Sequence, residues 1–372
     1  MPWNCIDKNI PVIFYGCGNN ARIVKKLLIQ KGIVPTAYCD SNQNLIGNII
    51  EEVPVLSYEQ VKKCYKEYYI ILTVAINNAL DIIHTLKEAK ETQPIFHMEK
   101  PFKVDEELFE YEYLLKNLES FETIYDIMED EISKMLLVES INSKLSGSKL
   151  NLVKYIDGDS FFDQTFIPVS KHYNYVDVGA YTGDTLLRFY AFVGGEYDSI
   201  HAIEPDKANF SALQDVIKYG RLDNVHLYNV GGWNRKDMLT FYTLDHNVEH
   251  FDSPNFFRHM KKPTDSSWGM DEKRYIEEKI IVDTIDNLLG DSPCDVIKIN
   301  ALAADFQTLE GCKKTLHRCK PIIVGEYGTR KENLTDMILF IKEQNLGYKF
   351  FLRQKKIFQD CKTIFYAVPN KF

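Results

Sequence analysis

The chain has 372 residues, of which 45% are hydrophobic and 13% aromatic, and its formal net charge is −9. This length predicts two domains, and the apolar content is sufficient for large buried cores. The acidic balance argues against a general binder of nucleic acid or of anionic membranes.

Targeting, membrane and metal signals are weak throughout the sequence. The eight cysteines include no C-x-x-C pair and no Cys/His cluster with zinc spacing, so we expect reduced thiols and no metal site. The N-terminal stretch MPWNCIDKNIPVIFYG lacks the basic start of a secretion signal. The longest apolar run, residues 68–76, is about half as long as a membrane span. We therefore expect a soluble, cytoplasmic protein.

The first hundred residues alternate between strand and helix patterns. The strand-like runs IPVIFYG, VPTAYCD and YYIILTVAI are separated by segments with apolar residues at helical spacing. Short links between such elements favour a parallel sheet with helices on its faces. Residues 1–102 are therefore predicted to form a small Rossmann-like domain.

The first strand–helix junction of this domain carries a G-x-G-x-x-A pattern, with an acid at the end of the next strand. Taken alone, the pattern indicates NAD. The stretches YCDSN and VPVLSYEQV instead resemble the nucleotide-binding-like domain at the front of sugar acetyltransferases, which implies nucleotide-sugar binding or a scaffold role. The candidate nucleotide or sugar site comprises Gly16, Gly18, Asn19, Asn20 and Asp40. The two asparagines could equally cap the helix that follows.

Residues 103–150 are predicted to form a helical connection. Apolar residues recur there at alternating steps of four and three, at Leu114, Leu118, Phe121, Tyr125, Met128, Ile132 and Met135. This stripe is compatible with a dimerising coiled coil, which would make the chain a homodimer. It is also compatible with a long helix, or a helix pair, that packs on its own chain, which is the interpretation we favour.

From about residue 151 the strand–helix alternation returns, and the stretch VDVGAYTGDTLLRF at 176–189 stands out. It passes from a buried strand through a turn rich in glycine, hydroxyl and carboxylate groups into a helix, and ligands of parallel sheets bind at such strand ends. The turn is acidic and has no lysine, which disfavours a polyphosphate and favours a cationic ligand with an amino group and a ribose. Glu204 ends the next strand, where a carboxylate can accept both ribose hydroxyls. The two features together predict a nucleoside site.

These motifs, followed in order by IHAIEPDKANFSAL, NVHLYNVGGW, VDTIDNLL, DVIKIN and LEGCKKTL, resemble FkbM-type S-adenosylmethionine-dependent methyltransferases. The resemblance implies a class I methyltransferase fold for residues 151–372, with a seven-stranded sheet whose last strand is antiparallel. It implies S-adenosylmethionine as the cofactor, with residues 177–185 at its methionine part, Glu204 at its ribose and residues 229–231 by the adenine. The cofactor-binding residues so assigned are Asp177, Gly179, Ala180, Tyr181, Thr182, Gly183, Asp184, Thr185, Glu204, Pro205, Asn229 and Gly231.

One run departs from the family pattern. Members usually carry Asp-Ile-Glu-Gly-Ala-Glu after the fourth strand, whereas this chain has NALAAD at 300–305. A sugar hydroxyl is a poor nucleophile that usually needs a base or a metal. The catalytic candidates are Lys298, Asn300 and Glu326, which lie at predicted strand ends, although Glu326 could equally be an ion-paired acid. Residues 244–278 are predicted to fold over the site and to recognise the acceptor.

The leading hypothesis is O-methylation of a sugar, nucleotide-sugar or glycan precursor, with the first domain binding or presenting the acceptor. One alternative is an NAD-dependent sugar-nucleotide enzyme that uses residues 16–40, although no catalytic set is identified beside that fingerprint. Another is a non-catalytic scaffold whose methyltransferase domain has lost acids in the 300–305 run. We expect a small-molecule or glycan partner, with no nucleic acid and no membrane span.

Overall fold

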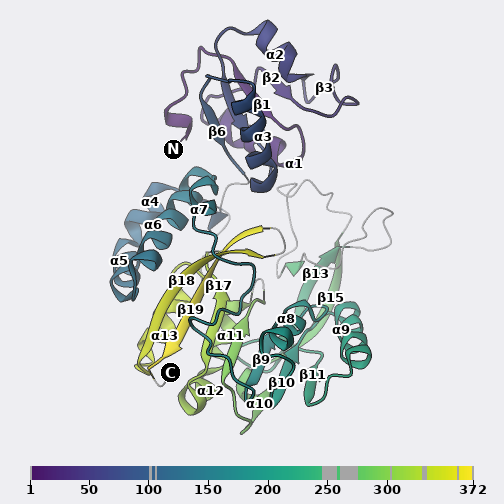
Figure 1. Cartoon of the computed structure of the whole chain (residues 1–372), viewed down its shortest axis with the longest axis vertical. Coiled ribbons are helices and arrows are strands. Elements are labelled where there is room, and N and C mark those ends of the chain that lie inside the picture. The colour runs from purple at the N-terminus through teal and green to yellow at the C-terminus, as the bar shows by residue number, and fades with distance from the viewer. Residues whose placement is uncertain are drawn as a thin grey trace.

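The computed structural model describes residues 2–99, 103–104, 107–244, 258–259, 275–301, 304–328, 333–357 and 360–370. Figure 1 shows an N-terminal α/β part, a group of helices beside the middle of the molecule and a larger C-terminal α/β part. The predicted α/β class, with two sheets, is confirmed.

The N-terminal part is a six-stranded sheet in the order β3-β4-β2-β1-β5-β6. All its strand pairs are parallel except β3–β4. Apolar residues cover both faces in two separate clusters, which is the burial that continuous apolar strands predict. After a short 3-10 turn at Pro2–Asn4, the elements are β1 (Val12–Tyr15), α1 (Asn19–Gln30), β2 (Ala37–Cys39), β3 (Ile49–Ile50), β4 (Val53–Leu56), α2 (Tyr58–Cys64), β5 (Tyr69–Leu72), α3 (Ile76–Glu88) and β6 (Ile95–His97).

The connecting region is helical, as predicted, but it does not contain one long helix. It comprises β7 (Lys103–Val104), β8 (Glu107–Leu108), α4 (Tyr111–Lys116), α5 (Leu118–Ile127), α6 (Glu131–Ser146) and α7 (Leu150–Val153). Asp130 caps α6 by accepting a hydrogen bond from the Ser133 amide at 2.8 Å. The Glu129 amide meanwhile bonds to the Phe350 carbonyl at 3.1 Å. The chain therefore leaves the helix to pair with the C-terminal sheet, and a local cap starts the next helix.

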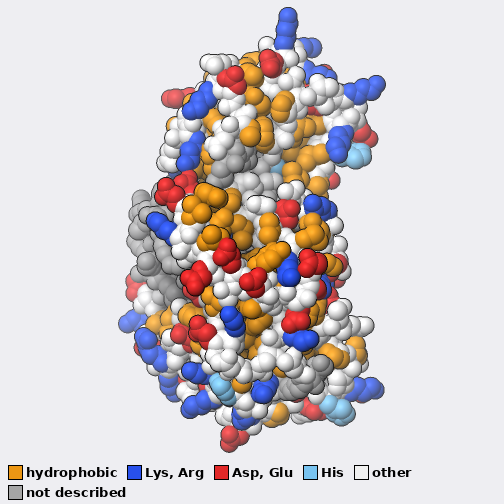
Figure 2. Space-filling view, turned by 90° about the vertical axis from the view of Figure 1, so that its left-hand side faces the viewer, with side chains coloured by type: hydrophobic (Ala, Val, Ile, Leu, Met, Phe, Trp, Pro, Cys, Tyr) orange, Lys and Arg blue, Asp and Glu red, His pale blue; other side chains and the backbone are white. Residues whose placement is uncertain are grey.

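This break divides the predicted apolar stripe between two environments. Phe121 and Met128 are buried in the core of the C-terminal part, whereas Leu118, Tyr125, Ile132 and Met135 are exposed. Figure 2 views the side of the molecule on which these helices lie and shows hydrophobic side chains gathered there. A continuous coiled-coil helix is therefore wrong, and the helices pack on their own chain. Homodimerisation through this region stays a prediction.

The C-terminal part is built on a seven-stranded sheet in the order β11-β10-β9-β16-β17-β19-β18. Strand β19 runs antiparallel between β17 and β18, which confirms the predicted antiparallel last strand. The strands are β9 (Asn174–Val178), β10 (Ser199–Ile203), β11 (Val225–Tyr228), β16 (Val296–Ile299), β17 (Ile322–Glu326), β18 (Tyr348–Ile357) and β19 (Asp360–Pro369). The helices are α8 (Asp184–Phe192), α9 (Lys207–Gly220), α10 (Ile285–Leu289), α11 (Asp305–Glu310), α12 (Lys313–Cys319) and α13 (Asp336–Glu343).

A separate four-stranded sheet is inserted between β11 and α10. It contains β12 (Gly231–Gly232), β13 (Asp237–Leu244), β14 (Arg258–His259) and β15 (Tyr275–Asp283), in the order β12-β15-β13-β14. The sequence patterns indicated strands here but not a second sheet. Most of the segment predicted to recognise the acceptor, residues 244–278, lies outside the described residues.

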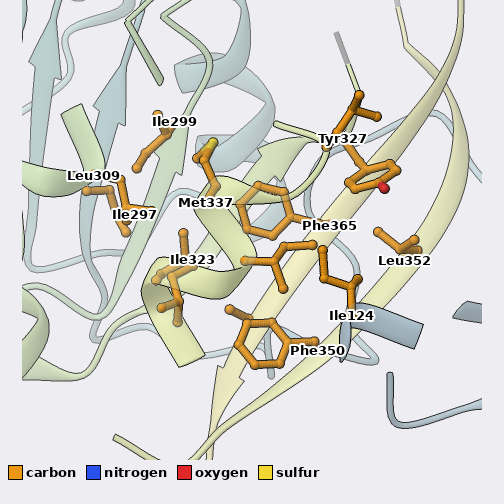
Figure 3. Close-up of a cluster of buried hydrophobic side chains, with 14 of the residues drawn as sticks. Ile124, Ile297, Ile299, Leu309, Ile323, Tyr327, Met337, Phe350, Leu352 and Phe365 are labelled. Atoms are coloured by element: carbon orange, nitrogen blue, oxygen red, sulfur yellow. The ribbon is translucent and has the colours of Figure 1, made fainter. Parts of the chain in front are cut away.

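One hydrophobic cluster joins the connecting helices to the C-terminal sheet. Figure 3 shows Ile124 of α5 among Ile323, Phe350 and Phe365, which come from β17, β18 and β19. The removal of these side chains from water holds α5 and α6 against the sheet. Across the described part of the chain, no helix is both long and apolar enough to cross a bilayer.

The carboxyl ends of the two parallel sheets meet at one junction beside the end of α6. The Glu99 amide, just after β6, bonds to the Gly147 carbonyl at 2.7 Å. Lys149 Nζ lies 3.5 Å from a Glu99 carboxylate oxygen and 3.0 Å from Asp360 Oδ1, at the tip of the β18–β19 hairpin. Figure 1 shows this hairpin extending toward the N-terminal part. Because β17 ends level with Ile364, the hairpin tip projects beyond the carboxyl edge of the C-terminal sheet.

Candidate active site

The glycine-rich turn after β9 has the backbone that a ligand cradle requires. Gly179, Tyr181 and Gly183 all have positive φ angles, of 75°, 52° and 94°. A Cβ on Gly179 would lie 2.1 Å from the backbone oxygen of Asn300, so only glycine lets the turn touch the end of β16. The amides of Gly179 and Ala180 both bond to the Ile203 carbonyl, which fixes the turn against β10.

A buried ion pair lies beneath this turn. Lys298 is 1% exposed and Asp177 is 0% exposed, and Lys298 Nζ lies 2.9 Å from Asp177 Oδ1. Lys298 Nζ also donates to the Gly179 carbonyl at 2.9 Å, and Thr185 Oγ1 donates to Asp177 Oδ2 at 2.7 Å. A pair this deeply buried is held in one geometry by its own hydrogen bonds. This placement indicates that Lys298 and Asp177 hold the glycine-rich turn in position.

The turn carries a concentrated negative potential. Burial raises the pKa of Asp184, which opens α8, while the Lys298 ammonium lowers it and the Asp177 carboxylate raises it. Burial, followed by the nearby carboxylates including Asp184 and Glu204, raises the pKa of Tyr181 to about 12. A cationic group would be attracted to this position and a polyphosphate repelled.

Glu204 is a fixed carboxylate at the end of β10. Its Oε2 accepts the Tyr181 amide at 3.0 Å and its Oε1 accepts the Asp206 amide at 2.8 Å. The Asn229 side chain donates to the backbone carbonyls of Glu204 and Pro205, which joins the ends of β10 and β11. These two amide bonds hold the Glu204 carboxylate in place, and a carboxylate oxygen can accept more than one hydrogen bond.

The described residues fit S-adenosylmethionine. A Cβ on Gly179 would collide with the Asn300 backbone oxygen and push the turn away from β16, and a Cβ on Gly231 would lie 3.1 Å from Val282 and 3.7 Å from Pro205, so both glycines keep these strand ends closely packed. The acidic turn suits the amino and sulfonium groups, and Glu204 suits the ribose. Thr182 lies in the same turn, within the stretch 177–185 that the resemblance assigned to the methionine part of the cofactor.

The three catalytic candidates occupy different environments. Val178 pairs with Ile299, and Ile299 pairs with Gly325, so Gly179, Asn300 and Glu326 are level at neighbouring strand ends. Glu326 is buried, and its Oε2 accepts from Lys362 Nζ at 2.9 Å. Glu326 is therefore an ion-paired acid, which was one of the two alternatives that the sequence left open. Asn300 is partly buried at the central position of this row.

The acid retained in the divergent run has a structural partner that sequence reasoning missed. Asp305 accepts from the Ala301 amide at 2.5 Å and from Asn333 Nδ2 at 3.0 Å. Asn333 also donates to the Glu326 carbonyl, so the loops after β16 and β17 are tied together. No pattern in the sequence around Asp305 predicts its contact with Asn333, which lies much later in the chain. Leu302 and Ala303 lie outside the described residues.

The residues of the candidate N-terminal site are brought together at the carboxyl ends of β1 and β2. Gly16 has φ 97°, and a Cβ there would lie 2.5 Å from Val74. Gly18, not an asparagine, is the N-cap of α1, and it makes no side-chain capping bond. Asn19 and Asn20 lie inside the first turn, so the expectation that they cap the helix is wrong. Asp40 accepts from the Asn42 amide at 2.9 Å and from the Cys17 thiol at 3.1 Å.

Tyr58 and Lys62 have the Tyr-x-x-x-Lys spacing of short-chain reductases, but their environment argues against that chemistry. The Tyr58 hydroxyl donates to Glu91 at 2.7 Å, and burial together with this bond raises its pKa. A reductase tyrosine that donates a proton near neutral pH needs the opposite shift. Lys62 Nζ lies 5.5 Å from the centre of the Tyr58 ring.

Two further features bear on the site. Within the described ranges, no group of three or more His, Cys, Asp or Glu side chains has a metal-binding arrangement. A groove of about 620 Å³ is lined by residues of α5, α13 and β18, at the opposite end of the strands from the glycine-rich turn. The chemistry of the glycine-rich turn therefore does not involve that groove.

Comparison with known proteins agrees with this geometry. Residues 177–350 match the family model described as the Methyltransferase FkbM domain. The crystal structure of Methyltransferase FkbM from Methylobacillus flagellatus KT has a TM-score of 0.70 and 16% identity, and the match covers 96% of this chain and 89% of that one. This likeness shows the fold. The predicted resemblance is confirmed for the C-terminal domain, whereas the acetyltransferase-like character of the N-terminal part stays a prediction.

Two methylases match less of the fold. An rRNA methylase from Streptococcus thermophilus has a TM-score of 0.31 and 13% identity, and the match covers 65% of this chain and 98% of that one. A precorrin-6y C5,15-methyltransferase from Geobacter metallireducens has a TM-score of 0.31 and 13% identity, with 61% and 90% covered. Among curated proteins, no relative is found.

Proposed function

We propose that this chain, whose residues 177–350 form an FkbM-type methyltransferase domain, transfers a methyl group from S-adenosylmethionine to a hydroxyl of a sugar, nucleotide-sugar or glycan precursor. The observation that carries the proposal is the fixed Glu204 carboxylate beside the acidic, positive-φ turn at 179–183. When bound, the cofactor supplies an electrophilic methyl group on a cationic sulfur.

The chain's own residues have three tasks in this reaction. Glu204 would hold the ribose, and the turn would orient the methionine part, since Lys298 fixes the Gly179 carbonyl from below. The row formed by Gly179, Asn300 and Glu326 would then place the acceptor beside the transferred methyl. Positioning of this kind supplies much of the rate of a methyl transfer.

The arrangement of the two sheets supports a nucleotide-linked sugar as the acceptor. Gly16 and Asp40 lie at the carboxyl edge of the N-terminal sheet, which meets the carboxyl edge of the C-terminal sheet at the Glu99–Lys149–Asp360 junction. A nucleotide held on the first edge would direct its sugar toward the second. The raised pKa of Tyr58 gives no support to the NAD-dependent alternative.

The test is methyl transfer by the full chain to a panel of acceptors. Purified protein would be incubated with S-adenosylmethionine carrying a deuterated methyl group and with UDP-, GDP- and dTDP-hexoses or free hexoses, and the products weighed by mass spectrometry. We expect labelled nucleotide-sugars, and we expect Asp40→Ala to raise KM for them while leaving cofactor affinity unchanged. Cofactor binding without transfer to any sugar would contradict the proposed acceptor class and favour a scaffold.

A further inference from the structure

We propose that Lys144 accepts the proton from the acceptor hydroxyl during methyl transfer, a role that rests on the O-methylation proposed above. No feature of the local sequence around Lys144 indicated chemistry. Its importance comes from where α6 ends: between the carboxyl edges of the two sheets, with the next residues joined to the N-terminal part through the Gly147–Glu99 bond.

The Lys144 side chain extends from α6 over the loop that follows β17. A Cβ on Gly328 would lie 2.5 Å from Lys144 Nζ and 2.7 Å from its Cε. Gly328 has φ 75° and is two residues beyond Glu326, the last member of the level row of strand ends. The glycine is therefore the residue that admits the lysine head group to this position.

This position lies on the far side of β16 from Glu204 and the turn, which is the side on which we place the acceptor. Glu204 and the turn at 179–183 lie on one side of β16, whereas β17 lies on the other. A hydroxyl aligned with a methyl group above Asn300 would therefore approach from the Glu326 side, where the Lys144 amine is. Ser140 and Thr363, whose hydroxyl oxygens are 3.2 Å apart, fix α6 against β19 and so hold the lysine at this edge.

The surroundings of Lys144 lower its pKa, so that more of the amine is neutral near pH 8 than in an ordinary lysine. Burial, followed by the nearby Lys149 ammonium, lowers the pKa of Lys144 to about 8, while the Glu326 carboxylate opposes this shift. Glu326 is itself paired with Lys362, and Lys149 is paired with Glu99 and Asp360.

The step balances without another reactant. The hydroxyl oxygen forms a bond to the methyl carbon, the sulfur–carbon bond breaks with its electrons left on sulfur, and the hydroxyl proton moves to Lys144 Nζ. The resulting ammonium then releases its proton to water. A positioned base of this kind contributes about 10²- to 10⁴-fold to rate.

The first test needs no acceptor. Trace labelling of the full chain with acetic anhydride across a pH series, read by mass spectrometry of peptides, reports the titration and access of each lysine. We expect Lys144 to react with a midpoint near pH 8, and Lys134, a partly exposed lysine of the same helix, is labelled in the same samples as an internal reference. A Lys144 that is unreactive, or whose midpoint lies at the ordinary lysine value of about 10, would overturn the inference.

The second test uses the nucleotide-sugars that accept methyl groups from the wild-type protein. Lys144→Met is expected to lower kcat by about 100-fold or more, to leave cofactor affinity unchanged and to remove the rise in kcat with pH centred near 8. Lys134→Met is the matched control and should keep the wild-type profile. An active Lys144→Met with an unchanged pH profile would refute the role of Lys144 alone. Absence of transfer by the wild type would refute the proposed function and, with it, this role.

Discussion

The buried Lys298–Asp177 pair provides the clearest prediction for stability. In Lys298→Met the Asp177 carboxylate would remain at 0% exposure without its cation, and uncompensated buried charges cost about 3–5 kcal/mol. The lost bond from Lys298 Nζ to the Gly179 carbonyl, at 2.9 Å, adds about 1 kcal/mol. For a domain of this size, a loss of about 4 kcal/mol lowers Tm by roughly 10 °C.

The assay is urea denaturation of the full chain, followed by circular dichroism, with calorimetric titration of S-adenosylmethionine on the same samples. Lys171→Met is the control, because its pair with Glu196 has a similar 2.8 Å contact but is 66% and 57% exposed, and it should cost at most about 1 kcal/mol. The double variant Asp177→Asn with Lys298→Met should recover part of the loss, since both charges are removed together. A cost below about 1 kcal/mol for Lys298→Met would refute the argument.

Two further predictions concern the same sheet. Gly179→Ala should cost at least about 2 kcal/mol of stability and abolish cofactor binding, because its Cβ would lie 2.1 Å from the Asn300 oxygen at a positive φ. Gly194→Ala is the control for the φ strain alone, since Gly194 has φ 68° and open space around it. Equal losses of stability in the two variants would contradict the steric account. Burial and the neighbouring His226 lower the pKa of His201 to about 4, so the unfolded chain binds a proton between about pH 6.5 and 4 that the folded chain does not. Stability should therefore fall by about 3 kcal/mol on acidification through this window, measured by denaturation at both ends, and His201→Gln should show a smaller fall.

The parts of the fold that the sequence predicted are those governed by local patterns. Continuous apolar runs identified the parallel strands, and the transition from β9 into α8 identified a turn whose glycines do have positive φ. Glu204 was found because a strand end fixes where its side chain lies. Each of these features depends on a few adjacent residues, so periodicity and turn chemistry are sufficient.

The parts that were wrong or missed depend on contacts between distant residues. The apolar stripe left a coiled coil, a long helix and a helix pair open, and pairing between Glu129 and Phe350 together with the Asp130 cap divides it between separate helices. The position of Lys144 over Gly328 follows from how α6 packs on β19, which no local pattern specifies. The inserted four-stranded sheet was missed for the same reason, since its strands read locally like those of the main sheet.

The most direct test of the central claim is calorimetric titration of the full chain with S-adenosylmethionine, S-adenosylhomocysteine and NAD. We predict micromolar binding of the first two, weakened about 10- to 100-fold in Glu204→Gln because a charge-assisted bond to the ribose is lost. Glu196→Gln, on the exposed surface, should bind as the wild type does. Binding of both methionine derivatives that is indifferent to Glu204→Gln, or binding of NAD alone, would contradict the assignment of this site.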